Sequence, residues 1–150
     1  MPDDDLLKPT IVDTPASVDR PWRVDSLVYP AFFGGPIAAA VLGAINARRL
    51  GVSGRTISLI AAAGATALAA QLLVAAFFLQ ETSGSVQRFS YSLAGVAVWG
   101  VVQVAQRRPF RVFLLRGGEP ASLWGPGVGM VIVSALTQFL LLLLVNSAVK

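Results

Sequence analysis

Four long apolar runs, separated by short polar segments, dominate the chain after residue 25. The pattern predicts membrane-spanning helices near residues 27–49, 56–80, 88–108 and 122–148. The third is the shortest and most polar, and its alternative is a helix at the membrane interface. Residues 26–47 contain no charged side chain. As one helix they would extend roughly 33 Å, enough to cross a hydrocarbon core of about 30 Å. Because no run shows a polar face, buried helices of a soluble domain explain the pattern less well. We therefore expect an all-α integral membrane four-helix bundle.

Composition supports this class and divides the chain into two parts. Of the 150 residues, 55% are hydrophobic and only 13% are charged, which is typical of a membrane protein. Residues 1–25 hold six aspartates and four prolines and are predicted to form a short, disordered polar tail. Residues 26–150 then form the transmembrane domain. The net charge is +4, but the arginines sit at the ends of apolar runs, as topology signals do. We expect no nucleic-acid partner.

The first run contains a helix-breaking motif, FFGGP, in which Pro36 follows two glycines. A proline inside a helix removes one backbone hydrogen bond, so we expect a kink or local unwinding there. A kink that only serves packing is the simpler interpretation, and a discontinuous helix that forms a binding site is the alternative. Small residues follow at four-residue spacing and predict a stripe for close helix packing, against this chain or a second copy: Gly35, Ala39, Gly43 and Ala47.

Three glutamines interrupt the later apolar runs: Gln71, Gln103 and Gln138. In lipid, a glutamine commonly makes one hydrogen bond between helices. Together with Pro36, these side chains are alternatively the candidate lining of a path for a neutral solute.

A basic and apolar stretch separates the last two runs, RRPFRVFLLRGGEP at residues 107–120. It is expected to lie on the membrane surface, with its four arginines among anionic headgroups, or to be a basic loop that orients the protein. The surface position and the orienting role are compatible, and both concern Arg107, Arg108, Arg111 and Arg116. Trp22, between Arg20 and Arg23, is expected to anchor the start of the domain at headgroup depth.

The residue types needed for catalysis are missing from the sequence. There is no histidine and no cysteine, and no Asp, Glu, Lys or Arg lies within the apolar runs. These absences argue against a common zinc site, an imidazole base and an ion-coupled transporter. We expect a protein that is not an enzyme and binds no cofactor or metal.

Two stretches, FFGGPIAAAVLGAINARRLG and RGGEPASLWGPGVGMVIVSAL, carry a resemblance. They are similar to parts of a family of small bacterial membrane proteins, in which an FGGP helix ends in an Asn and a basic-Leu-Gly turn. In that family a glycine pair, then Ala-Ser and an aromatic residue, precede the last helix. The resemblance implies a four-span unit and no catalytic residue. Pro109 and Pro126 depart from that pattern and leave the helix ends there open.

The stripe and the uncharged spans favour an accessory or assembly subunit that acts through helix contacts with other membrane proteins or with itself. The alternative is an oligomeric channel or carrier for a neutral solute. Either would be a multi-pass protein of the bacterial cytoplasmic (inner) membrane, in contact with the lipid bilayer. The segments 48–55 and 107–120 hold seven arginines, against five basic residues elsewhere. The positive-inside rule therefore places these loops in the cytoplasm and both termini outside.

Overall fold

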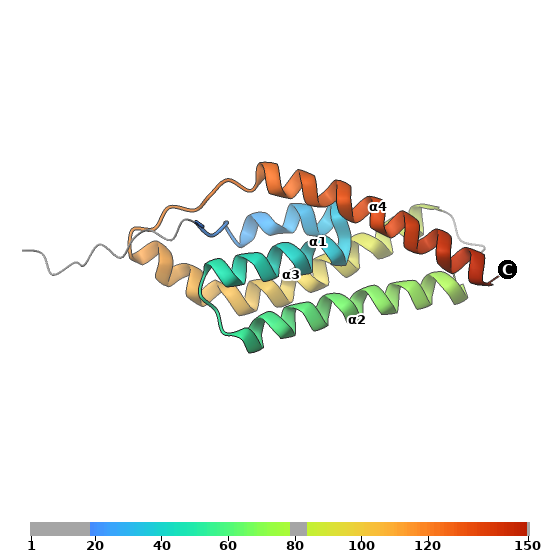
Figure 1. The fold of residues 1–150 in the computed structure, drawn as a ribbon, viewed down its shortest axis with the longest axis horizontal. Coiled ribbons are helices and arrows are strands. Elements are labelled where there is room, and N and C mark those ends of the chain that lie inside the picture. The colour runs from blue at the N-terminus through green and yellow to red at the C-terminus, as the bar shows by residue number, and fades with distance from the viewer. Residues whose placement is uncertain (1–18, 79–83, 150) are drawn as a thin grey trace, which may run out of the picture.

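The computed structural model describes residues 19–78 and 84–149. It contains a short 3₁₀-helix, Asp25–Leu27, and four helices. These are α1 (Val28–Arg49), α2 (Gly54–Phe78), α3 (Gly84–Leu115) and α4 (Trp124–Val149). They pack side by side in one elongated bundle (Figure 1). The predicted all-α bundle of four helices is therefore confirmed.

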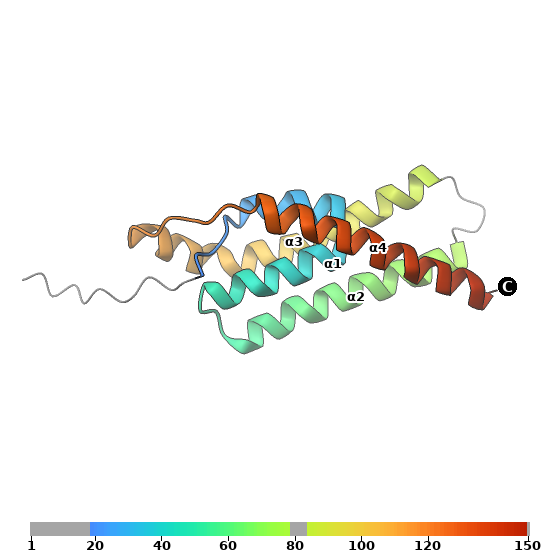
Figure 2. The same ribbon diagram turned by 45° about the horizontal axis from the view of Figure 1, so that its top comes forward.

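Helix α1 does not run straight; it reverses direction at Gly35. This residue has φ 64° and ψ −158°, far from helical values. The first arm (residues 25–34) and the second arm (residues 36–49) lie antiparallel to each other in both views of the ribbon (Figures 1 and 2). A hydrogen bond of 2.7 Å from the Trp22 backbone N–H to Asn46 Oδ1 joins the start of this hairpin to its end.

We call Gly34, Gly35 and Pro36 the hairpin tip. The backbone preferences of these residues explain the reversal. The backbone region that Gly35 adopts is accessible essentially only to glycine. Pro36 then opens the second arm, where its missing N–H would have no helical partner anyway. The expected break at Pro36 is thus present, but it is a full turn rather than a kink in one helix.

The reversal changes how the chain can cross a membrane. By length and composition alone, three helical stretches could cross: Asp25–Arg49, Gly54–Ala76 and Trp124–Val145. The hairpin arms hold 10 and 14 residues and so extend only roughly 15 Å and 21 Å, about half a bilayer and two thirds of one. The single helix predicted for the first span is therefore corrected to a hairpin of two short arms, because Gly35 turns the chain back.

Of the three candidate stretches, those in α2 and α4 remain long enough to cross a bilayer. Helices α2 and α4 have 25 and 26 residues and reach roughly 37–39 Å. Both start at the end of the bundle where the hairpin opens (Figure 1). Helix α3 runs back between them and would cross wherever they do, although no stretch of it is a candidate span by length and composition. Its buried residues recur every three or four positions, at Gly95, Val98, Val102, Gln106 and Phe110. This stripe makes α3 the helix against which the hairpin packs.

Helix α3 continues past its predicted end at residue 108 and through Pro109 to Leu115. The separate surface segment expected from residue 107 is therefore corrected: residues 107–115 belong to α3. Packing accounts for the extension, because Phe110 joins the cluster of buried residues that contains Trp22, Val24 and Leu42. The helix is held by this cluster on both sides of the proline.

The predicted boundary of the tail, at residue 25, also needs correction. Trp22 and Val24 are 3% and 2% exposed and lie in the core, and Pro21 is fully buried, so residues 21–24 of the predicted tail are packed. Residues 1–18 lie outside the described part of the structure. Trp22 is thus not an interfacial anchor, since its backbone and ring are held inside the protein. Trp124, 82% exposed at the start of α4, suits an interface.

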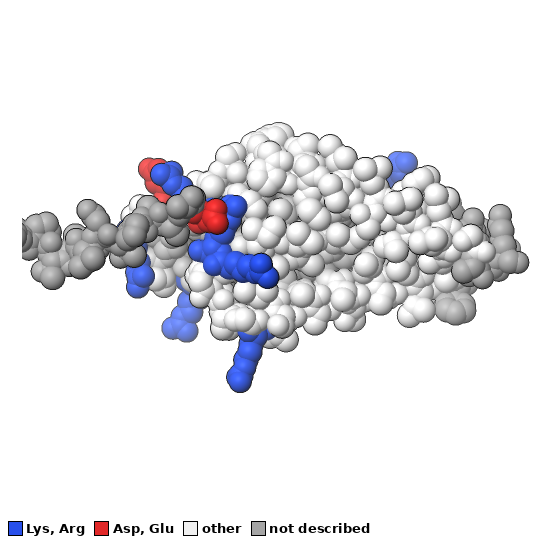
Figure 3. All heavy atoms as spheres, viewed as in Figure 1, with Lys and Arg blue, Asp and Glu red and all other residues white. Residues whose placement is uncertain are grey.

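Positive charge gathers at one end of the bundle, and the long middle of this face is uncharged (Figure 3). We call it the arginine end. Of the ten arginines in the described residues, only Arg88, near the start of α3, belongs to a segment at the opposite end (Figure 1). The other nine belong to segments at the arginine end: Arg20, Arg23, Arg48, Arg49, Arg55, Arg107, Arg108, Arg111 and Arg116. Residue 19 is at the arginine end, and the end of α4 is at the other (Figure 1). The two ends of the described chain therefore lie at opposite ends of the bundle, an arrangement that does not favour placing both on one side of a membrane.

Candidate functional site

A buried amide network closes the open end of the hairpin. Asn46 Nδ2 donates to the Trp22 carbonyl oxygen (3.2 Å) and to Gln106 Oε1 (2.8 Å). Gln106 Nε2 donates in turn to the Gly43 carbonyl oxygen (2.6 Å). Asn46 and Gln106 are both fully buried. The network joins the segment before the first arm, the second arm and α3.

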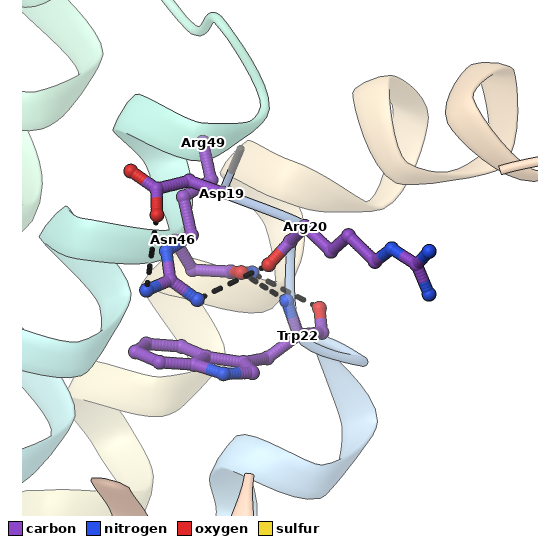
Figure 4. A network of polar contacts seen from close by, with 5 residues as sticks. All are labelled: Asp19, Arg20, Trp22, Asn46 and Arg49. Atoms are coloured by element: carbon purple, nitrogen blue, oxygen red, sulfur yellow. Dashed lines mark hydrogen bonds and ion pairs between the residues drawn. The ribbon is translucent and has the colours of Figure 1, made fainter. Parts of the chain in front are cut away.

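Arg49 covers this network from outside (Figure 4). Its guanidinium lies 4.0 Å from the centroid of the Trp22 ring and donates to the Arg20 carbonyl oxygen (3.1 Å). Asp19 is 4.0 Å away at the limit of an ion pair. The loop before α4 adds one backbone bond, in which the Ala121 N–H donates to the Pro21 carbonyl oxygen (2.9 Å). These contacts fix the hairpin, so this end of the molecule has a structural role.

Replacing Asn46 by alanine should lower the stability of the protein by about 2–4 kcal/mol. The change leaves the Trp22 N–H, the Trp22 carbonyl and Gln106 without their buried partner, at about 1–3 kcal/mol for a group that finds no other. The measurement is the thermal unfolding midpoint in detergent. Ser53→Ala is the control, because the exposed Ser53 hydroxyl pairs only with Thr56. Equal midpoints for the two variants would contradict this role of Asn46.

The predicted small-residue stripe packs within the chain. Gly35, Ala39, Gly43 and Ala47 are all buried. A side chain at Gly43 would collide with Val102 of α3, and one at Gly35 would collide with the Tyr91 ring. Gly35 forms the turn and the other three lie on the second arm, so the four do not form one continuous helical stripe.

All three remaining helices contact the hairpin tip. On α3, a Cβ atom at Gly95 would collide with the Ala31 carbonyl oxygen and lie 2.8 Å from the Gly35 backbone. On α2, Gly64 packs on Ala40 near the Pro36 carbonyl, and on α4, Val131 packs on Gly34. The tip is thus enclosed by the other three helices, as irregular backbone in a membrane must be.

Polar side chains without partners lie just beyond the tip. Within the described residues, no hydrogen-bond partner is found for Gln71 Oε1, Tyr91 Oη, Ser134 Oγ or either amide atom of Gln138. Ser134 and Gln138 are 0% and 6% exposed. Buried polar groups in proteins nearly always have a partner, and each one left without costs about 1–3 kcal/mol. A sixth such atom among the described residues, Gln103 Oε1, lies at the arginine end. The other five lie beyond the tip and make that region the candidate functional site.

Spacing along the helices places these groups at similar depth. Gln71 follows Gly64 by seven residues and Gln138 follows Val131 by seven. Each is therefore two turns, or roughly 10 Å, beyond the residue that contacts the tip and on a similar face. Ser134 and Tyr91 are about one turn beyond the tip on α4 and α3. We call Gln71, Tyr91, Ser134 and Gln138 the sub-tip polar cluster.

The structure thus groups three of the four candidate lining residues and separates the fourth. Pro36 lies in the tip, with Gln71 and Gln138 beyond it. Gln103 lies instead at the arginine end, where its Nε2 donates to Asp25 Oδ1 (2.6 Å). The sequence prediction missed Tyr91 and Ser134, although a polar residue inside an apolar run was the available signal for both.

The broken helix adds backbone groups of both kinds to this region. The last carbonyl groups of the first arm and the first N–H groups of the second arm have no partner within their own helix. The tip thus offers acceptors and donors side by side, and the cluster adds hydroxyl and amide groups. No Asp, Glu, Lys or Arg lies on α2, α3 or α4 within one turn of the cluster residues, apart from Arg88 three residues before Tyr91. Such a surface suits an uncharged compound that both donates and accepts hydrogen bonds.

The four arginines predicted at the membrane surface are all exposed. They lie on the last turns of α3 and just beyond it, at the arginine end. Among the described residues, no group of three or more His, Cys, Asp or Glu side chains could hold a metal ion.

No protein-family model matches the chain, and neither a curated protein nor a solved structure shows significant similarity to it. The family resemblance drawn from the two sequence motifs stays a prediction.

Proposed function

We propose that the protein is a channel or carrier subunit for a small neutral solute, with its site at the hairpin tip. The observation that carries the proposal is the sub-tip polar cluster, which places unpartnered polar side chains from three helices beside a broken helix. Transporters use discontinuous helices in the same way to present backbone groups at mid-membrane. The solute would be an uncharged hydroxyl or amide compound.

Two features support a neutral solute over an ion. The cluster consists of amide and hydroxyl groups, and charge at mid-membrane usually comes with ionisable side chains that stabilise it. The chain is also small, and three spans with one hairpin leave little room for a pore. We therefore expect the working form to be an oligomer.

The accessory or assembly role is the second candidate. The stripe that suggested it is occupied by α2 and α3 of the same chain, so it offers no surface to another protein. A partner would have to use the outer faces of α2 and α4, whose apolar windows are only 11% buried. Exposed apolar faces suit contact with lipid as well as with a partner protein, so their exposure does not distinguish the accessory role from the transport role.

We place the protein in the bacterial cytoplasmic membrane with the arginine end inside. Nine arginines against one among the described residues is a strong bias under the positive-inside rule. On this assignment the hairpin enters from the cytoplasm, and the cluster lies toward the outer half of the membrane.

Replacing Gln138 by leucine should lower solute permeability several-fold or more without unfolding the protein. Leucine removes both polar atoms of the Gln138 amide from the cluster at similar volume, so the polar surface beyond the tip is interrupted. The measurement is shrinkage and reswelling of proteoliposomes by stopped-flow light scattering, with glycerol, urea and erythritol as solutes.

Thr137→Val is the matched control for this variant. Thr137 neighbours Gln138 on α4 but is exposed, and its hydroxyl bonds only to the Val133 carbonyl (2.9 Å). Its permeability should equal that of the unmodified protein. Permeability equal to that of protein-free liposomes for every solute would contradict the proposed function.

A further inference from the structure

A second polar site lies at the arginine end, away from the hairpin tip. An open pocket of about 410 Å³ separates the end of α1 from the last turns of α3. Three arginines line it (Arg49, Arg108 and Arg116), together with four apolar residues (Leu50, Pro109, Val112 and Phe113). We call it the arginine pocket.

The two helices supply the lining by their periodicity. Arg108, Val112 and Arg116 are spaced four residues apart, so they share one face at the end of α3. Pro109 and Phe113 form the neighbouring row. Arg49 faces them from the last turn of α1, with Leu50 beside it. The helix extension beyond residue 108 therefore creates the pocket.

Two of the three charges in the pocket have no carboxylate partner among the described residues, and the third, on Arg49, is 4.0 Å from Asp19 at the limit of an ion pair. Arg108 and Arg116 are exposed, and no carboxylate of the described residues lies within ion-pair distance of either. Arg49 is 22% exposed and is oriented by the Trp22 ring and the Arg20 carbonyl oxygen. One fixed and two free guanidinium groups surround an apolar floor.

We propose that the arginine pocket binds the phosphate headgroup of an anionic phospholipid. Guanidinium groups bind phosphate oxygens through paired hydrogen bonds, which explains the cations. The apolar floor and the position at the membrane surface explain why the phosphate belongs to a lipid, whose glycerol and upper acyl carbons would cover Val112 and Phe113. Basic pockets between helices at the cytoplasmic surface recognise lipids in this way. This inference does not depend on the solute proposed for the hairpin tip.

The test compares two double variants of the full-length protein. Arg108→Gln with Arg116→Gln removes two cations from the pocket. Arg107→Gln with Arg111→Gln removes the same charge from exposed positions of the same helix that do not line the pocket. Lipid adducts retained in native mass spectrometry, and the thermal midpoint in detergent, are measured with added phosphatidylglycerol, phosphatidylcholine or inorganic phosphate.

The unmodified protein should retain phosphatidylglycerol and gain thermal stability from it, but not from phosphatidylcholine. The pocket variant should need at least about tenfold more phosphatidylglycerol for the same effect, and the control variant should bind nearly as the unmodified protein does. Equal losses of phosphatidylglycerol binding in both double variants would contradict a specific pocket and would indicate a general electrostatic attraction between anionic lipid and the arginine end. Stabilisation by inorganic phosphate equal to that by lipid, or equal stabilisation by phosphatidylcholine, would overturn the lipid assignment.

Discussion

Replacing Gly35 by alanine should abolish the native fold or lower its stability by about 2–6 kcal/mol. The backbone region that Gly35 occupies costs any other residue about 1–3 kcal/mol. The new methyl group would also collide with the Tyr91 ring, and overpacking of this kind adds about 1–3 kcal/mol. The measurement is the yield of monodisperse protein in mild detergent, followed by its thermal midpoint.

Gly100→Ala provides the control for the same chemical change. Gly100 lies in α3 with no atom within 4 Å of an added Cβ, and its backbone is not in the positive-φ region. Alanine there should be neutral or stabilise by up to about 1 kcal/mol, since it is the better helix former. If Gly35→Ala unfolds at the same temperature as Gly100→Ala, α1 does not reverse at Gly35.

Cysteines placed near the two ends of the described chain should be labelled from opposite sides of the membrane. Arg23→Cys, at the arginine end, should react with an impermeant maleimide only after bacterial cells are opened. Ser147→Cys, near the end of α4, should react in intact cells. The chain has no cysteine of its own, so each signal comes from one site.

This experiment separates a hairpin from a span. If residues 28–49 crossed the membrane, Arg23→Cys and Ser147→Cys would be labelled together, because four crossings return the chain to its starting side. Ser53→Cys reports the side of the loop between α1 and α2 and should follow Arg23→Cys. Labelling of Arg23→Cys on the side opposite to Ser53→Cys would contradict the re-entrant hairpin.

The sequence predicted the helical class and most helix positions, since these depend on apolar composition and local signals. It did not distinguish one crossing helix from two half-length arms, because residues 26–47 are uncharged in either case. A signal for the turn was present in the sequence, because Gly35 can end one helix and Pro36 can begin the next. The direction of the turn, however, depends on how closely Gly95 and Tyr91 approach, and these residues are about sixty positions away.

The polar sites were predicted less well for a related reason. Asn46 and Gln106 pair across sixty residues, and nothing local indicates that they meet. Trp22 beside arginines is typical of a membrane interface, yet its backbone binds Asn46 and its ring lies under Arg49. Gln71 and Gln138 could be selected as polar residues in apolar runs. That Gln103 lies apart from them follows only from the fold.

The hairpin leaves the ribosome before α2, α3 and α4, yet it reaches its final contacts only after α4 has been made. Its tip exposes backbone groups that lipid cannot satisfy, and it is enclosed only by residues as late as Val131 of α4. During synthesis the hairpin must therefore stay unpacked, in the insertion machinery or at the membrane surface, until α4 has been made. We expect nascent chains stopped before α4 to leave this segment open to proteases, whereas chains that include α4 protect it.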